Sequence, residues 1–163
     1  MDAGLARQRH FPAINWLSSY SLYPPSLDQW FRDNIAQDYP EIRTAISGLL
    51  QVEAELQEIV QLVGSDALPV DQQLTLEVAR MIREYFLQQN GFHEVDAFCA
   101  VDLHYKMAKA ILTFQESAKN AMAAGAELQD VVNVPARTDL MRGRFEATYK
   151  DDIDACLLYT SPS

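Results

Sequence analysis

The sequence predicts a mainly α-helical protein that folds as a helical bundle behind a short loop-rich segment. Three observations lead to this prediction. After residue 25, apolar residues recur at three- and four-residue steps, as they do on one face of an α-helix. Prolines and glycines stand near the ends of several of these periodic segments. The connections between the segments are short, which favours antiparallel packing of neighbouring helices.

The first part of the chain contains a loop-rich segment and two predicted helices. Residues 1–25 hold three prolines and little helical period, so we interpret them as loop and short extended segments. Ser26 can cap a helix over residues 27–37. Pro40 suits the first turn of a second helix, which ends at Gly64, where the backbone often turns left-handed. The apolar stripe of this helix consists of Ile42, Ile46, Leu49, Leu50, Leu56, Ile59, Val60 and Val63.

The second part of the chain predicts further helices separated by short turns. The expected elements are a turn at 65–71, a helix from about 71 to 88, a short and then a long helix within 95–123, one or two turns at 127–133, and a helix from Pro135 toward Phe145. Gly91 is expected to interrupt the first of these helices, and Gly125 to stop the long one.

Composition and charge exclude several classes of function. The net charge is −10, and thirteen basic residues are scattered among twenty-three acidic ones, so no cluster exists to neutralise the phosphates of a nucleic acid. No apolar run approaches the roughly 20 residues that span a bilayer, and the N-terminus lacks the apolar core of a signal peptide. A metal site needs three or four convergent ligands, and the spacing of His93, His104 and the two cysteines predicts none.

Several long segments resemble the catalytic A subunit of V-type and archaeal or bacterial A-type rotary ATPases. They read RHFPAINWLSSYSLY at 9–23, AELQEIVQLVGSDALP at 54–69 and ARMIREYFLQQNGFHEVDAF at 79–98. The similarity extends through LDQWFRDNIAQDYPEIRTAI at 27–46 and reaches about Arg144. The second and third segments are also similar to the β subunit of F-type ATP synthases. The motifs occur in the family's order, which makes this a stronger signal than a single short pattern.

The resemblance implies a domain organisation. Residues 1–25 would be a remnant of the RecA-like α/β nucleotide-binding domain, and residues 26–155 would be the helical C-terminal domain. Residues 156–163, CLLYTSPS, carry no helical period. They read either as non-native sequence or as an ordinary frayed C-terminus.

The resemblance also implies what the complete protein does. It would couple ATP hydrolysis or synthesis to proton or sodium transport, using ATP or ADP with Mg, beside non-catalytic B subunits and the central stalk. It would lie in the cytoplasmic head at the membrane, with no direct membrane insertion. The chain contains no GxxxxGK[ST] loop for phosphates. No catalytic residue can be carried over, and we expect this chain alone to be inactive and not to bind nucleotide tightly.

Five residues are candidates for contact with the adenine ring. Phe11 falls where the resemblance places an aromatic ring against adenine, and Pro12 stiffens the backbone beside it. Phe92 lies in the segment that would fold over the other side of the purine, and stacking suits both rings. Gln89 and Asn90 offer amide groups for the purine edge. The alternatives are that Phe11 is a core aromatic and that the amides belong to an exposed helix end.

The turn at 65–71 is the second candidate site. In the F-type β subunit the corresponding turn meets the rotating central shaft, so Asp66, Leu68 and Asp71 are candidate rotor contacts by position. A plain surface turn is the alternative, because a strong charge signature is missing. The acids Glu53, Glu55 and Glu58 precede this turn and read as a solvated helix face.

Two functions of different classes remain open from the sequence. The first is a C-terminal part of a rotary ATPase catalytic subunit, which closes the adenine pocket and relays motion to the central stalk. The second is a non-enzymatic acidic helical module that binds a partner. A reading frame upstream that encodes GxxxxGKT would favour the first.

Overall fold

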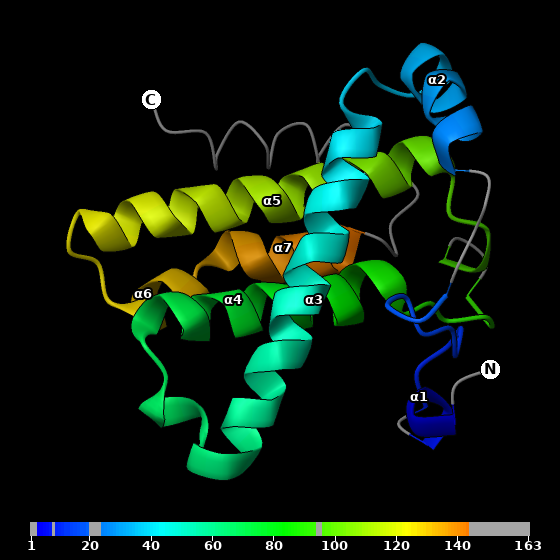
Figure 1. Cartoon of the computed structure of the whole chain (residues 1–163). Helices are drawn as coiled ribbons and strands as arrows, with labels where there is room; N and C mark the ends of the chain where they lie inside the picture. Colours follow the sequence, from blue (N-terminus) through cyan, green and yellow to red (C-terminus); the bar gives the residue numbers. More distant parts are fainter. Residues whose placement is uncertain (1–2, 8, 20–23, 94–95, 144–163) are drawn as a thin grey trace.

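The computed structural model describes residues 3–7, 9–19, 24–93 and 96–143, and its regular elements are helical (Figure 1). They are α1 Ala3–Arg7, α2 Pro24–Asn34, α3 Tyr39–Val63, the 3₁₀-helix η1 Ser65–Ala67, α4 Val70–Met81, the π-helix η2 Ile82–Leu87, the 3₁₀-helix η3 Asp96–Phe98, α5 Val101–Ala123, α6 Leu128–Val132 and α7 Pro135–Gly143. Within these ranges the structure contains no β-strand. The prediction of a mainly α-helical fold is therefore confirmed.

Three long elements form the body of the molecule. Helices α4 and α5 contact each other and run in opposite directions, although the segment that joins them contains η2 and η3 and is not a short turn (Figure 1). Helix α3 contacts both of them but crosses them steeply, so that its C-terminal half extends beyond the rest of the bundle (Figure 1). This half ends at the turn formed by η1. The expectation of antiparallel neighbours thus holds for α4 and α5 and not for α3.

The core lies where these three helices meet. Leu74, Val78 and Met81 of α4, Ile82 of η2 and Ile111 of α5 are completely buried. Burying a side chain of this size stabilises a fold by about 1.5–3 kcal/mol. Ile42, Ile46 and Leu50 of the predicted stripe join the same cluster. These contacts fix the position of α3 across the other two helices.

The ends of α3 follow from local chemistry. Pro40 stands in its first turn, where a missing backbone N–H costs nothing. Gly64 follows the last residue with φ 86°, in the region that favours glycine. Gly125 does the same after α5, with φ 103°. Both predicted glycine stops are confirmed.

Several predicted bounds near the N-terminus are wrong. Residues 3–7 form the short helix α1, where loop and extended segments were expected. Helix α2 starts at Pro24, before Ser26, and ends at Asn34. Two adjacent prolines at a helix start are compatible with helical φ and need no donor there. Ser26 is therefore inside the helix and does not cap it.

The helix predicted to reach Gln88 changes type before it ends. It is α-helical to Met81 and then forms η2, in which the N–H of Gln88 reaches back to the carbonyl oxygen of Arg83 at 2.9 Å. Helical structure stops at Leu87, four positions ahead of Gly91, so Gly91 does not interrupt it. The next backbone donor, the N–H of Gln89, forms a hydrogen bond with the carbonyl oxygen of Phe11. The expected continuation of the last helix to Phe145, and the tail at 156–163, lie outside the described residues.

Candidate functional site

The segment around Phe11 lies against the turn that follows η2. The backbone N–H of Gln89 donates a hydrogen bond to the carbonyl oxygen of Phe11, with an N–O distance of 2.6 Å. A Cβ atom at Gly91 would lie 3.3 Å from Cε1 of Phe11. The glycine therefore allows a close approach of the Phe11 ring to the turn. The structure brings the two predicted adenine segments together at this point.

Hydrogen bonds within the turn at 88–93 hold its shape. Asp96 is buried, and its carboxylate accepts a hydrogen bond from the backbone N–H of Asn90. The side-chain nitrogen of Gln89 donates to the carbonyl oxygen of Asp96 at 3.3 Å. The side-chain oxygen of Asn90 accepts from the N–H of Phe92 at 3.1 Å. Asp96 is a positioning residue that the sequence analysis missed, because a single aspartate has no distinguishing pattern.

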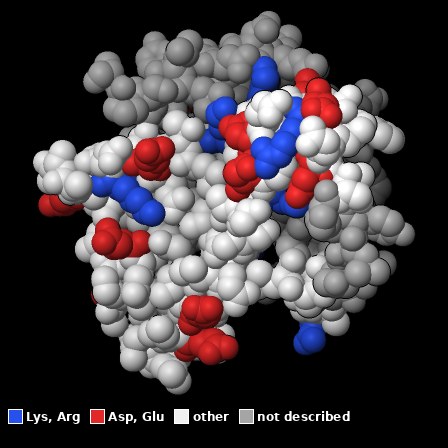
Figure 2. Space-filling model, turned by 45° about the horizontal axis from the view of Figure 1, so that its top comes forward, with Lys and Arg blue, Asp and Glu red and all other residues white. Residues whose placement is uncertain are grey.

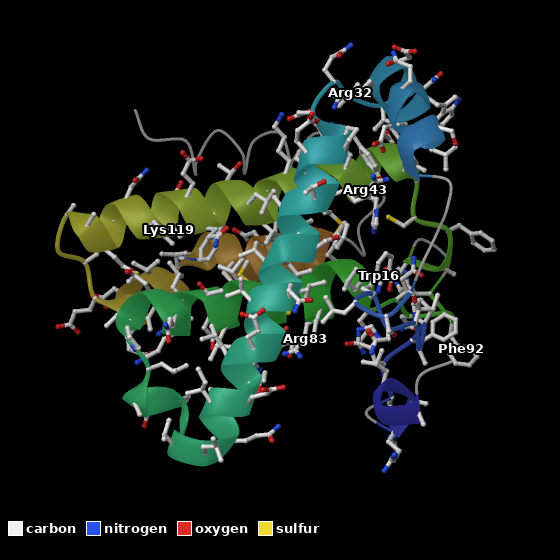
Figure 3. All side chains as sticks on the ribbon, viewed as in Figure 1. Trp16, Arg32, Arg43, Arg83, Phe92 and Lys119 are labelled. Carbon is white, nitrogen blue, oxygen red and sulfur yellow. The ribbon has the colours of Figure 1, made fainter. Side chains whose placement is uncertain are left out.

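The two candidate aromatic rings are accessible. Phe11 is 56% exposed, and Phe92 is fully exposed. Figure 3 shows Phe92 on the same side of the molecule as Trp16, beyond the right-hand end of the bundle. Pro12 is half-buried, and its carbonyl oxygen accepts a hydrogen bond from the N–H of Ile14 at 2.9 Å. Phe11 is therefore not a core aromatic in this chain.

The turn after α3 presents an apolar surface with two acids. Asp66 lies in η1 and Asp71 in the first turn of α4. Leu68 is only 6% exposed, which removes it from the accessible surface of the turn. The exposed apolar side chains here are Leu62, Val63 and Val70. A partner at this turn would meet these residues and the two acids.

A buried ion pair joins α3 to η2 close to the N-terminal segment, which comprises residues 9–19. Glu53 is 4% exposed, and its carboxylate lies 2.7 Å from the guanidinium of Arg83, whose side chain is 41% exposed. Burial raises the pKa of the Glu53 carboxyl above its ordinary value, and the charge of Arg83 opposes this shift. The interpretation of Glu53 as part of a solvated face is therefore wrong. Glu55 and Glu58 are exposed, as expected.

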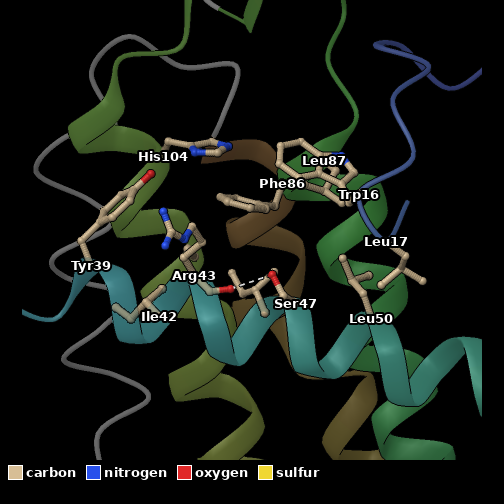
Figure 4. Close-up of a pocket in the computed structure, with 12 residues that line it drawn as sticks. Trp16, Leu17, Tyr39, Ile42, Arg43, Ser47, Leu50, Phe86, Leu87 and His104 are labelled. Atoms are coloured by element: carbon tan, nitrogen blue, oxygen red, sulfur yellow. Dashed lines mark hydrogen bonds between the residues drawn. The ribbon is translucent and has the colours of Figure 1, made fainter. Parts of the chain in front are cut away.

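An apolar cavity of about 140 Å³ lies between the N-terminal segment and the bundle (Figure 4). Trp16 and Leu17 form one wall, and α3, η2 and α5 form the others (Figure 4). The rings of His104 and Phe86 stack at its edge with centroids 3.9 Å apart. Burial lowers the pKa of His104 to about 4, so this ring is neutral at pH 7. Its lining residues are Trp16, Leu17, Tyr39, Ile42, Arg43, Ile46, Ser47, Leu50, Phe86, Leu87, His104 and Ala108.

Several ion pairs on the described surface link different helices. Arg32 pairs with Glu41, and Arg43 with Asp28 at 2.9 Å, so that α2 is tied to α3. Figure 2 shows acidic and basic side chains intermixed over this part of the surface, with no separate basic patch on the face in view. Lys109 lies 3.0 Å from the carboxylate of Asp38, which links α5 to the start of α3.

The described part of the chain offers neither a metal cluster nor a membrane span. No group of three or more His, Cys, Asp or Glu side chains converges there. None of the helices in those ranges combines the length and apolar character that crossing a bilayer requires. The candidate site is thus the pair of segments that meet at Phe11 and Gln89, together with the turn after α3.

Comparison with known proteins identifies the family. Residues 28–132 match the C-terminal domain of V and A type ATP synthase. The A subunit of the A-type ATP synthase from Methanosarcina barkeri is 50% identical over 157 residues, which is 96% of this chain and 27% of that protein. The corresponding A subunits from Natronomonas pharaonis and Methanoregula boonei are each 50% identical over 94% of this chain and 26% of their own length. The chain spans about a quarter of the length of these relatives. Because the match covers more than half of its residues, the chain belongs to the family of C-terminal domains of V- and A-type ATP synthases.

Proposed function

We propose that this chain acts as the C-terminal part of a catalytic A subunit, where it closes the adenine end of the nucleotide site and relays motion to a central stalk. The observation that carries this proposal is the junction at Phe11. There, a segment near the start of the chain is hydrogen-bonded to the turn after η2, and both belong to regions shared with the A subunits of A-type ATP synthases. The complete protein would couple ATP hydrolysis or synthesis to proton or sodium transport.

The residues at the junction fit a purine. Phe11 and Phe92 offer exposed ring faces, and a base gains about 1–3 kcal/mol by stacking on an aromatic side chain. Gly91 lacks the Cβ that would crowd Phe11. The backbone bonds of Gln89 and Asn90 keep the turn close to Phe11. These residues would bind and orient the adenine of ATP or ADP.

The chain carries no phosphate loop for the other end of the nucleotide. Its sequence contains no GxxxxGK[ST] motif, and such a loop positions the phosphates and a bound Mg in P-loop ATPases. In the proposed complete protein, another region would supply the phosphate and Mg contacts. Residues 1–25 would be the end of that RecA-like domain, and residues 26–155 the helical domain that follows it.

Helix α3 has the geometry of a lever between the site and a distant contact. It has 25 residues, which span roughly 38 Å at 1.5 Å per residue. Its buried stripe packs against α4 and α5, close to the cavity that Trp16 lines, and its end carries the turn with Asp66 and Asp71. A rigid helix of this length would convert a small rotation at the bundle into a displacement at the turn. Central-stalk subunits would meet this turn, and B subunits would flank the domain, in a cytoplasmic head peripheral to the membrane.

A chimera tests the proposal. In the A subunit of the A-type ATP synthase from Methanosarcina mazei, which is 47% identical over 157 residues, this chain would replace the matched region. We expect the assembled complex to retain ATP turnover. The unsubstituted Methanosarcina complex is the control for assembly. A chimera that assembles but turns over no ATP would contradict the proposal, and would favour a helical module that only binds a partner.

A further inference from the structure

The cavity in Figure 4 lies apart from the residues assigned to adenine. It is lined by side chains of α3, η2 and α5, and by Trp16 and Leu17 of the N-terminal segment. Neither Phe11 nor Phe92 belongs to its lining. The proposed function makes no use of it.

The size and walls of the cavity suit one kind of occupant. An apolar cavity of about 150 Å³ in another protein stays dry and binds benzene, and this one measures about 140 Å³. Trp16, Tyr39 and the stacked pair of Phe86 and His104 supply aromatic surfaces around it. Aromatic rings pack against such surfaces in offset or edge-to-face geometry. The walls thus match a flat ring of similar size.

Three side chains with polar groups at the cavity make contacts within the chain. Arg43 is paired with Asp28 at 2.9 Å. The hydroxyl of Ser47 donates to the carbonyl oxygen of Arg43 at 3.0 Å. The ring of His104 stacks on Phe86, and burial keeps it neutral at pH 7 by lowering its pKa to about 4. A charged ligand would lose its hydration and find no unpaired opposite charge among these groups, so an uncharged ligand fits better.

We propose that this cavity is a binding site for a small, uncharged aromatic molecule of one or two fused rings. The occupant would lie between Trp16 of the N-terminal segment and Phe86 of η2. Because its walls come from both parts of the chain, binding would hold the N-terminal segment against the bundle. Trp16 is five residues from Phe11, and Leu87 is two residues from Gln89, so the occupant would also stabilise the Phe11–Gln89 junction.

Methyl NMR of the 163-residue chain, with indole as the probe, tests this site. We expect saturable shifts of the methyl signals of Ile42, Ile46 and Leu50, which line the cavity. The substitution Ser47→Leu places a branched apolar side chain at the exposed edge of the lining, and should weaken indole binding at least tenfold. Thr44→Leu is its matched control, because Thr44 is exposed on the same helix, makes the same kind of hydroxyl bond to a carbonyl four residues earlier, and does not line the cavity.

The outcomes separate the proposal from its alternatives. Unchanged indole affinity in Thr44→Leu, with the loss in Ser47→Leu, would support the site. The absence of saturable shifts in the unsubstituted chain would overturn it, as would equal affinity in the two variants. Saturable shifts confined to the methyl signals of Ala97 and Val101, which lie near Phe98 in the sequence, would mean that indole binds the exposed rings instead, and would overturn it too. Adenosine should not displace indole; displacement would place the cavity in the nucleotide site and would overturn the proposal. The result in the chimera does not affect this test.

Discussion

The backbone N–H of Gln89 is bonded to the carbonyl oxygen of Phe11 over 2.6 Å, across 78 positions of sequence (89 minus 11). The bond uses the first backbone donor that the helical hydrogen bonds of η2 leave available, and so couples the end of that helix to the N-terminal segment. Gly91 then lies under the Phe11 ring. The two segments that we propose to face adenine are therefore held together by main-chain geometry, which substitutions at Gly91 can probe.

Two glycine substitutions should differ in their effect on stability. Gly48 is exposed within α3 and has no atom within 4 Å of an added Cβ, so Gly48→Ala should raise the free energy of unfolding by about 0.5–1 kcal/mol. At Gly91 the added Cβ would lie 3.3 Å from the Phe11 ring, which must shift by a few tenths of an ångström. Gly91→Ala should therefore stabilise less than Gly48→Ala, or not at all. Urea unfolding followed by circular dichroism measures both. Equal stabilisation would show that Phe11 does not pack on Gly91.

The Glu53–Arg83 pair should make stability depend on pH in a particular direction. The folded-state pKa of Glu53 is raised, so its contribution is fully present below the unfolded pKa and is lost as pH rises through the folded value. Relative to Glu53→Gln, the unsubstituted chain should gain stability as pH falls from 7 toward 4.5. Urea unfolding at several pH values measures this difference. Glu58→Gln, at an exposed position of the same helix, should show no such trend.

Removing the charge of Arg83 should destabilise the fold more than removing the charge of Glu53. Arg83→Leu leaves a nearly buried carboxylate with its charge uncompensated, and should cost about 2 kcal/mol at pH 7. Glu53→Gln leaves an arginine that is 41% exposed and can be hydrated. A larger loss in Glu53→Gln than in Arg83→Leu would contradict this assignment.

His104 should make the fold sensitive to acid. Its folded pKa of about 4 lies below the ordinary value of 6.5, so stability is complete above pH 6.5 and is lost as pH falls toward 4. The loss would be up to about 3 kcal/mol from this shift alone. His104→Phe keeps a ring against Phe86 and should flatten the profile over this range. The two variants His104→Phe and Glu53→Gln should change the pH profile in opposite senses. A profile unchanged by His104→Phe would show that the ring is hydrated.

The sequence predicted α3 and α5 because each has a long apolar stripe and a glycine just after its end. Gly64 and Gly125 end helices in the structure as expected, since both adopt positive φ. The π-helix η2 could not be predicted, because its residues carry the same period as the α-helix before it. Just beyond its end, the N–H of Gln89 is bonded to Phe11, which is distant in sequence.

The candidate site was predicted only in part, for a similar reason. The resemblance pointed to Phe11 and the turn at 89–92, and local patterns could not show that the two lie together. Glu53 looks like its exposed neighbours in sequence, and only the crossing of α3 over η2 buries it. Asp96 supports the turn through the fold of a loop, which has no periodic signal. In each of these cases, the three-dimensional arrangement of the chain sets the surroundings of the residue, and no local sequence pattern reveals it.

The chain alone should hydrolyse no ATP. It lacks a glycine-rich phosphate loop with its Lys and Ser or Thr, and those groups supply the positioning and charge stabilisation of phosphoryl transfer. Phosphate release by the purified chain should equal that of a sample without protein. Release that co-purifies with the chain through a second column, at constant specific activity, would contradict this expectation.

Phe11 and Phe92 should contribute to ATP affinity in the chimeric protein. Replacing either ring with Ala removes a stacking surface worth about 1–3 kcal/mol, and a loss of about 1.4 kcal/mol corresponds to a tenfold weaker Kd. Phe98→Ala is the matched control, because Phe98 is also a highly exposed phenylalanine near the same turn and is not assigned to adenine. Equilibrium binding of a fluorescent ATP analogue measures each variant. If stacking is their role, Phe11→Ala and Phe92→Ala weaken binding of ATP and ADP to a similar extent, since both nucleotides carry the same base, while Phe98→Ala leaves it unchanged. Unchanged affinity in both Phe11→Ala and Phe92→Ala would exclude an adenine sandwich at this junction.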